Sequence, residues 1–186
     1  CRRQRQMCIR DRLSGGTVVG IDLDERALEV MREHVAEAGL DHRVTARCAS
    51  LHDPIFPDAS FDLLWEEGVL HLLDADESLT QCRRLLEPGG HLVMHETNRW
   101  FDSVRGRLPD LGFALRSTHP LPEHHWLTAY AEPLDARLHA YLESHDTEGL
   151  DETTAQALAT HRRAVASIRS DPAATDCAFY IAQKVG

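Results

Sequence analysis

The chain has 186 residues, enough for one domain with a substantial core. Acidic residues outnumber basic ones, 30 to 20, and the formal charge of -10 excludes the basic stripe that a nucleic-acid groove needs. No apolar run reaches membrane-spanning length, which argues against a membrane partner. The five cysteines are scattered without a C-x-x-C pair, so we expect a reduced, cytoplasmic protein.

The first twelve residues differ from the rest because they hold five arginines and show neither helical nor strand periodicity. A basic targeting arm is one interpretation, but such arms are also Ser-rich and amphipathic. The segment resembles peptides translated from sequencing-adaptor DNA. We therefore expect residues 1–12 to be non-native, and residues 13–186 to form a single domain that lacks its true N-terminus.

Strand and helix patterns alternate along the first half of the chain. Residues 17–22 are a β-branched apolar run typical of a buried parallel strand. Asp24 can cap the helix that follows, and Gly39 is a natural helix end. Residues 43–48 are expected to form a second strand. This spacing predicts a parallel sheet with right-handed crossovers.

The next strand is predicted over residues 61–65, after the turn at residues 56–60. Leu79, Cys82, Leu85 and Leu86 share one helical face, and Pro88-Gly-Gly turns the chain into a strand over residues 91–95. Further along we predict a helix at 102–108, a strand at 113–117, a helical region at 121–143 kinked at Pro133, a helix at 151–170 and a strand at 177–182.

Three motifs in this order resemble the class I S-adenosylmethionine-dependent methyltransferases. They are V-V-G-I-D at 18–22, F-P-D-A-S-F-D-L-L-W at 56–65 and R-L-L-E-P-G-G-H-L-V-M at 84–94, and residues 121–134 resemble one subgroup. The resemblance implies an α/β fold with a Rossmann-like sheet and helices on both faces. It also implies S-adenosylmethionine as cofactor, methyl transfer to a small-molecule acceptor, and substrate-side helices within 99–175.

The resemblance assigns the cofactor to the carboxyl ends of the strands. There a carboxylate can accept hydrogen bonds from both ribose hydroxyls, although an acid at this place can also cap a helix. An apolar neighbour would cover the adenine. The family often has an acid after its third strand, and this chain has Ala-Ser-Leu instead. The candidate cofactor-binding residues are Asp22, Leu23, Ala49, Ser50, Leu51 and Glu66, the last of which can alternatively cap a helix.

Three side chains are candidates for a catalytic base, which is needed where the acceptor must lose a proton. Glu67 matches a glutamate of the subgroup, His71 follows one helical turn later, and Glu96 ends a strand with His95 beside it. The sequence does not choose among these three. Residues that could cover the substrate are Trp100, His124, His125, Trp126 and Tyr130.

The glycine-rich loop of the family has no counterpart in the sequence. Gly15-Gly16 precedes the strand that ends at Asp22, whereas the family loop follows a strand. We therefore expect the fold to lack its first strand and that loop, and to leave the flanking strands exposed. Weak cofactor binding and impaired methyl transfer are expected as a result.

Two other functions remain open at this stage. An NAD-dependent oxidoreductase of the Rossmann type also places an acid after its second strand to bind ribose. A non-enzymatic metal-binding or interaction domain is a second alternative, because the chain has 12 histidines and His95, Glu96, His119, His124 and His125 could cluster. No motif has the spacing of a metal site, so we predict no metal.

Overall fold

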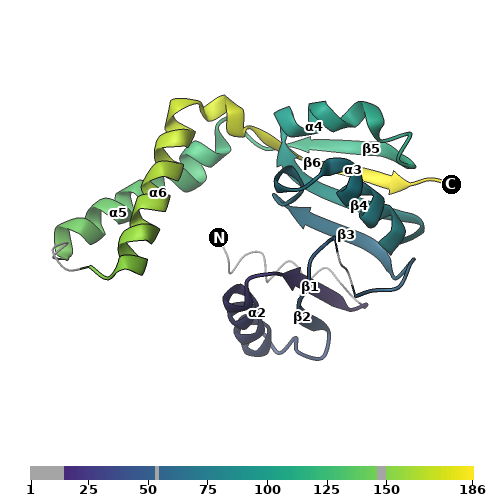
Figure 1. The fold of residues 1–186 in the computed structure, drawn as a ribbon, viewed down its shortest axis with the longest axis horizontal. Helices are drawn as coiled ribbons and strands as arrows, with labels where there is room; N and C mark the ends of the chain where they lie inside the picture. The colour runs from purple at the N-terminus through teal and green to yellow at the C-terminus, as the bar shows by residue number, and fades with distance from the viewer. Residues whose placement is uncertain (1–14, 53–54, 146–149) are drawn as a thin grey trace. The chain divides into compact units, whose positions relative to one another are not determined.

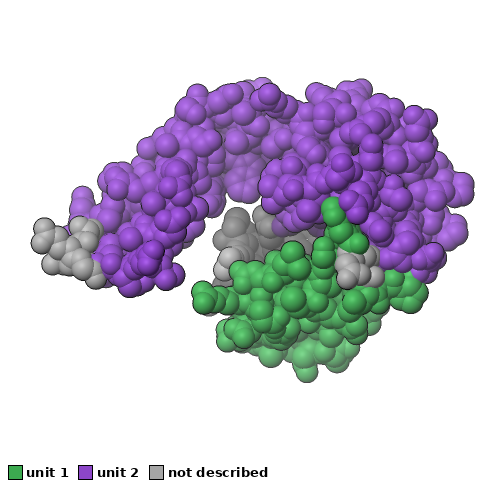
Figure 2. Space-filling model, in the orientation of Figure 1, with its two compact units in different colours: residues 1–57 green, residues 58–186 purple. Residues whose placement is uncertain are grey.

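The computed structural model describes residues 15–52, 55–145 and 150–186, so the expectation for residues 1–12 lies outside the described part. The chain divides into two compact units, residues 1–57 and residues 58–186, which are described separately (Figure 2).

Unit 1 contains a two-stranded parallel sheet and one helix (Figure 1). Strands β1 (Val18–Asp22) and β2 (Val44–Cys48) pair in parallel, and α2 (Glu25–Glu37) connects them. The predicted cap is confirmed, because the Asp24 side chain accepts a hydrogen bond from the Arg26 backbone N–H at 3.0 Å. Gly20 faces α2, where an added Cβ would lie 2.6 Å from the end of the Met31 side chain.

Unit 2 contains a four-stranded sheet in the order β3-β4-β6-β5. Strands β3 (Phe61–Glu67) and β4 (Leu86–Thr97) pair in parallel, as expected. Strand β6 (Cys177–Lys184) runs antiparallel to both β4 and β5 (Phe113–Pro120). The sheet is therefore mixed: the parallel pairing expected from the alternating first half is confirmed for β3 and β4, and the later strand β6 runs antiparallel to its neighbours.

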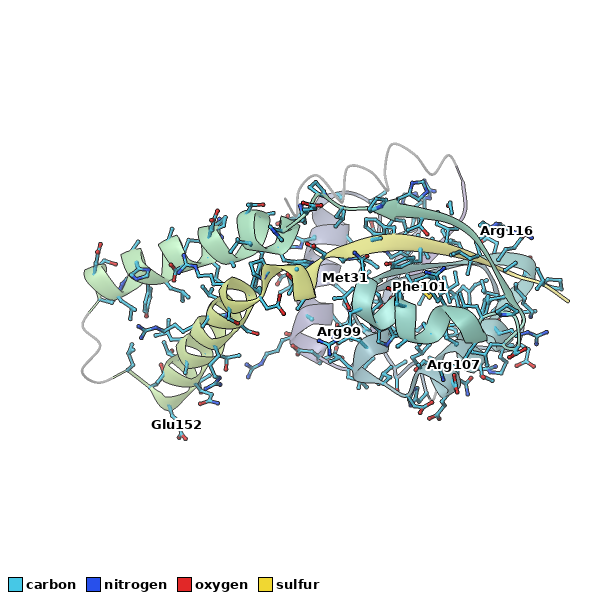
Figure 3. All side chains as sticks on the ribbon, turned by 90° about the horizontal axis from the view of Figure 1, so that it is seen from above. Met31, Arg99, Phe101, Arg107, Arg116 and Glu152 are labelled. Atoms are coloured by element: carbon cyan, nitrogen blue, oxygen red, sulfur yellow. The ribbon has the colours of Figure 1, made fainter. Side chains whose placement is uncertain are left out.

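One face of this sheet is covered by α3 (Ala75–Leu85) and α4 (Asn98–Val104). Leu79 of α3 and Met94 of β4 are fully buried. Phe101 of α4, labelled in Figure 3, stacks its ring on that of Tyr180 in β6 with centroids 3.6 Å apart. Helix α4 begins earlier than predicted because the Thr97 hydroxyl accepts from the Trp100 backbone N–H at 3.3 Å. The short helix η2 (Arg105–Arg107) then continues the segment.

The helices between β5 and β6 form a hairpin with its own small core of Ala131, Leu138, Val165 and Ile168 (Figure 1). A π-helical segment, η3 (Leu127–Ala131), leads into α5 (Glu132–Ser144). Pro133 lies in the first turn of α5, directly after the π-helical segment, so the backbone is irregular in the turn that precedes the proline. The kink expected at Pro133 stays a prediction. Helix α6 (Glu152–Ser170) is capped by Asp151, and η4 (Pro172–Thr175) follows it.

Each sheet has a strand with a single neighbour. Among the described residues β1 pairs with β2 alone, and β3 pairs with β4 alone. Large apolar side chains lie exposed along both strands, with Leu63 and Trp65 of β3 at 45% and 60% and Ile21 of β1 at 36%. Within the described ranges, no helix has both the length and the apolar character needed to cross a membrane.

Candidate functional site

Acidic side chains gather where β3 and β4 end. The parallel register pairs Glu66 with Met94 and Glu67 with His95, so consecutive residues of each strand face opposite sides of the sheet. Glu66 and Glu96 therefore lie on the face that α3 and α4 cover, and Glu67 lies on the other.

Glu96 is buried, with 2% of its surface exposed, and both of its carboxyl oxygens are hydrogen-bonded to His71. The backbone N–H of His71 donates to Oε1 at 3.1 Å, and Nδ1 lies 2.9 Å from Oε2. His71 belongs to the short helix η1 (Leu70–Leu72), and 42% of its side chain is exposed. The structure thus brings together two of the three candidate bases, and a carboxylate at Nδ1 favours the tautomer in which Nε2 carries a free lone pair.

Glu66 holds the start of η1 in place. Its Oε1 accepts hydrogen bonds from the backbone N–H groups of Val69 and, at 3.4 Å, Leu70. The other oxygen, Oε2, is buried and has no hydrogen-bond partner among the described residues. Burial raises the pKa of Glu66 to about 8, and the negative charge of Glu96 adds to the rise against the lowering effect of the Val69 N–H.

Glu67 has a different environment from Glu66. Its side chain is exposed, and Oε1 accepts a hydrogen bond from Nε1 of Trp65 at 3.2 Å. The third candidate base therefore lies on the opposite face from the pair formed by His71 and Glu96.

His95 lies in an aromatic cluster on the same face as Glu67. Its ring stacks on Phe179 at 4.5 Å and on Trp126 at 6.2 Å between centroids, and its Nε2 lies 3.4 Å from Sγ of Cys177. Trp126 Nε1 donates to the same sulfur at 3.2 Å, and burial raises the pKa of the Cys177 thiol. No local sequence signal indicates the part that Cys177 and Phe179 play here, because only the antiparallel register of β6 brings them beside His95.

The predicted substrate cover is only partly assembled. Trp126 and Tyr130 meet edge to face at 5.6 Å, close to His95. The backbone N–H of His124 donates to Asp176 Oδ1 at 2.7 Å, and that of Trp100 caps α4. His125 makes a backbone turn with Pro122. Trp126 and Tyr130 therefore belong to the aromatic cluster, whereas Trp100, His124 and His125 make other structural contacts.

The remaining candidate cofactor residues lie in unit 1, near the ends of β1 and β2. Asp22 is exposed; its Oδ1 accepts from the Asp24 N–H at 2.9 Å, and its Oδ2 has no partner among the described residues. Leu23 is 71% exposed beside it. A carboxylate with a free oxygen and an exposed apolar neighbour fit a ribose diol and an adenine face, so these residues suit S-adenosylmethionine.

Residues 49–51, which follow β2, have no carboxylate that could accept from an adenine amino group. The backbone N–H of Ala49 donates to the Asp22 carbonyl at 3.2 Å, and the Ser50 hydroxyl accepts from the His52 N–H at 3.1 Å. Leu51 is half-buried. The histidine cluster of the metal-binding alternative does not form in the described part of the chain, where no three His, Cys, Asp or Glu side chains are placed to hold a metal ion.

Comparison with known proteins identifies the family. Residues 5–94 match the family model described as a methyltransferase domain. Methyltransferase GfsG of Streptomyces halstedii is 36% identical over 121 residues, covering 61% of this chain and 41% of the relative. The 27-O-demethylrifamycin SV methyltransferase of Amycolatopsis mediterranei is 35% identical over 78 residues, or 41% of this chain and 29% of the relative. The chain thus spans less than half the length of these two relatives.

Solved structures show the same fold. The [4+2]-cyclase SpnF superposes with a TM-score of 0.77 at 22% identity, over 98% of this chain and 70% of that one. A sarcosine dimethylglycine methyltransferase from Galdieria sulphuraria gives a TM-score of 0.72 at 15% identity, over 97% and 74%. The fold and the acids at its strand ends define a Rossmann-like α/β protein. Together with the matched segment, these similarities support a class I S-adenosylmethionine-dependent methyltransferase.

Proposed function

We propose that the protein of which this chain is part transfers a methyl group from S-adenosylmethionine to a small-molecule acceptor. The observation that carries the proposal is the family match over residues 5–94. The likeness to SpnF, a cyclase, is a reason to test the reaction directly, because a shared fold does not fix the chemistry. The rifamycin relative, whose name specifies a small-molecule substrate, supports an acceptor of that class.

Asp22 and Leu23 are the residues of unit 1 that we propose hold the cofactor. The Asp22 carboxylate would accept hydrogen bonds from the ribose hydroxyls, and Leu23 would cover an adenine face. When bound, S-adenosylmethionine supplies an activated methyl group on a sulfonium. The protein then has mainly to align the acceptor and to accept a proton where the acceptor carries one.

We propose the cytoplasm as the site of action. The support is that Cys48, Cys82 and Cys177, the cysteines in the described part of the chain, are all free thiols. Free thiols persist where the compartment is reducing.

Cofactor binding is tested by calorimetric titration of the chain with S-adenosylmethionine, and methyl transfer by tritium incorporation from the labelled cofactor into a panel of small alcohols, phenols and amines. Asp22→Asn retains an oxygen for the Asp24 N–H but loses the charge, so affinity should fall on the order of tenfold. Asp41→Asn, an exposed change in the same unit, serves as the control and should bind like the unchanged chain. Equal affinity in the Asp22 variant would remove its ribose role, and NADH binding without S-adenosylmethionine binding would overturn the function.

A further inference from the structure

Glu66 and Glu96 form a carboxyl pair that the fold holds on one face of the sheet. They lie on adjacent parallel strands, with Glu96 two residues beyond Met94, the cross-strand partner of Glu66. Glu96 is fully buried, and the charges of the two groups act on each other. Two close carboxylates in a partly desolvated place do not both ionise readily, so the pair favours a single negative charge.

The hydrogen-bond partners indicate which carboxyl carries that charge. Both oxygens of Glu96 have a partner in His71, since Oε1 accepts from its backbone N–H and Oε2 lies 2.9 Å from its Nδ1, an environment that suits a carboxylate. Glu66 receives its donors at Oε1 alone, and its Oε2 is buried without a partner among the described residues. A buried oxygen without a hydrogen-bond partner destabilises the ionised carboxylate more than the neutral acid.

The neighbouring elements supply no compensating cation. In the described part of the chain no Lys or Arg forms an ion pair with either carboxyl group, and His71 is the partner of Glu96 alone. Helix α3 presents Cys82, whose pKa is raised to about 12 by burial and by the charge of Glu66, so this thiol is neutral. Cys177 of β6 lies beside His95 on the other face of the sheet, and its pKa is also raised, chiefly by burial, with smaller contributions from the charges of Asp176 and Glu96.

We propose that Glu66 is a positioning residue that stays protonated, so that the pair holds one charge on Glu96 and His71 presents Nε2 as the base to a hydroxyl acceptor. This inference rests on the proposed function. The half-exposed ring of His71 leaves its outer nitrogen accessible. The acceptor oxygen would bond to the methyl carbon while the carbon–sulfur bond breaks and its electron pair stays on sulfur. The hydroxyl proton passes to Nε2 and then to solvent.

A hydroxyl is the acceptor class for which this arrangement matters most. An alcohol or phenol is a weak nucleophile until its proton begins to leave, whereas a neutral amine already has a free electron pair. A carboxylate behind the imidazole stabilises the imidazolium that forms as the proton arrives. Glu66 would act only through Glu96 and His71, because its free oxygen is buried.

The test uses two spectroscopic signatures that need no acceptor. Infrared spectra at pH 7 should contain the carbonyl band of a protonated carboxylic acid, which Glu66→Gln removes and Glu143→Gln, an exposed change on α5, retains. Nitrogen-15 NMR of labelled histidine should show His71 protonated at Nδ1 in the unchanged chain and in Glu66→Gln. Glu96→Gln should lose that preference. As Glu66 ionises near pH 8, the His71 signals should shift, and Glu66→Gln should abolish this shift.

The outcomes separate the inference from the function on which it rests. A protonated-acid band that survives Glu66→Gln, or His71 protonated at Nε2, would overturn the inference whatever the cofactor binding. If both signatures are as expected but calorimetry on the same samples finds NADH binding without S-adenosylmethionine binding, the proposed function fails, and the base role of His71 fails with it.

Discussion

Replacement of Glu66 by glutamine should change how stability depends on pH. The folded chain holds the Glu66 proton up to about pH 8, whereas the unfolded chain releases it near the ordinary value of 4.5. Folding therefore keeps a proton that unfolding gives up, and the free energy of unfolding falls as pH rises through this window. One pKa unit corresponds to about 1.4 kcal/mol, so this group should cost up to about 3 kcal/mol of stability between pH 5 and 7.5.

Glutamine keeps an oxygen for the Val69 and Leu70 N–H groups but has no proton to lose. Urea unfolding of both chains at pH 5, 6 and 7.5, followed by circular dichroism, gives the stability difference at each pH. The other titrating groups are the same in both chains, so their contributions to the pH dependence of stability largely cancel in the difference. The variant should gain up to about 3 kcal/mol relative to the unchanged chain across the window. A difference that stays constant with pH, as Glu143→Gln should give, would refute a protonated Glu66.

Three further experiments test the described structure. Leu79→Ala, at a fully buried position of α3, should lower the free energy of unfolding in urea by about 2–5 kcal/mol, and a loss below about 1 kcal/mol would contradict the assigned core. Gly89 has a φ of +79°, so Gly89→Ala should lower the free energy of unfolding by about 1–2 kcal/mol. In the same assay Gly106→Ala should be nearly neutral, because an added Cβ there meets no other atom. When the folded chain reacts with a thiol reagent, peptide mapping should find exposed Cys48 labelled far faster than buried Cys82, because burial raises the pKa of the Cys82 thiol to about 12. Equal labelling rates would disprove the burial of Cys82.

The order of strands and helices could be predicted because periodicity and turn residues are local signals. The β-branched run before Asp22, the cap at Asp24 and the helical face of Leu79 each depend on residues close together in the chain. The direction of β6 depends instead on pairing across the α5–α6 hairpin, which local patterns do not encode. The π segment before Pro133 was missed for a similar reason, because proline suggests an irregularity without fixing the turn in which it falls.

The candidate site shows how far strand register decides chemistry. Glu66 and Glu67 are adjacent identical acids, and each was a reasonable candidate from sequence, but the pleat separates them onto opposite faces. The register of β3 against β4 then places Glu66 beside buried Glu96, while Glu67 is left exposed with Trp65. A shift of one residue would exchange the two glutamates, burying Glu67 near Glu96 and leaving Glu66 in solvent. The raised pKa near His71 therefore follows from backbone pairing, and no inspection of the acids themselves could have assigned it.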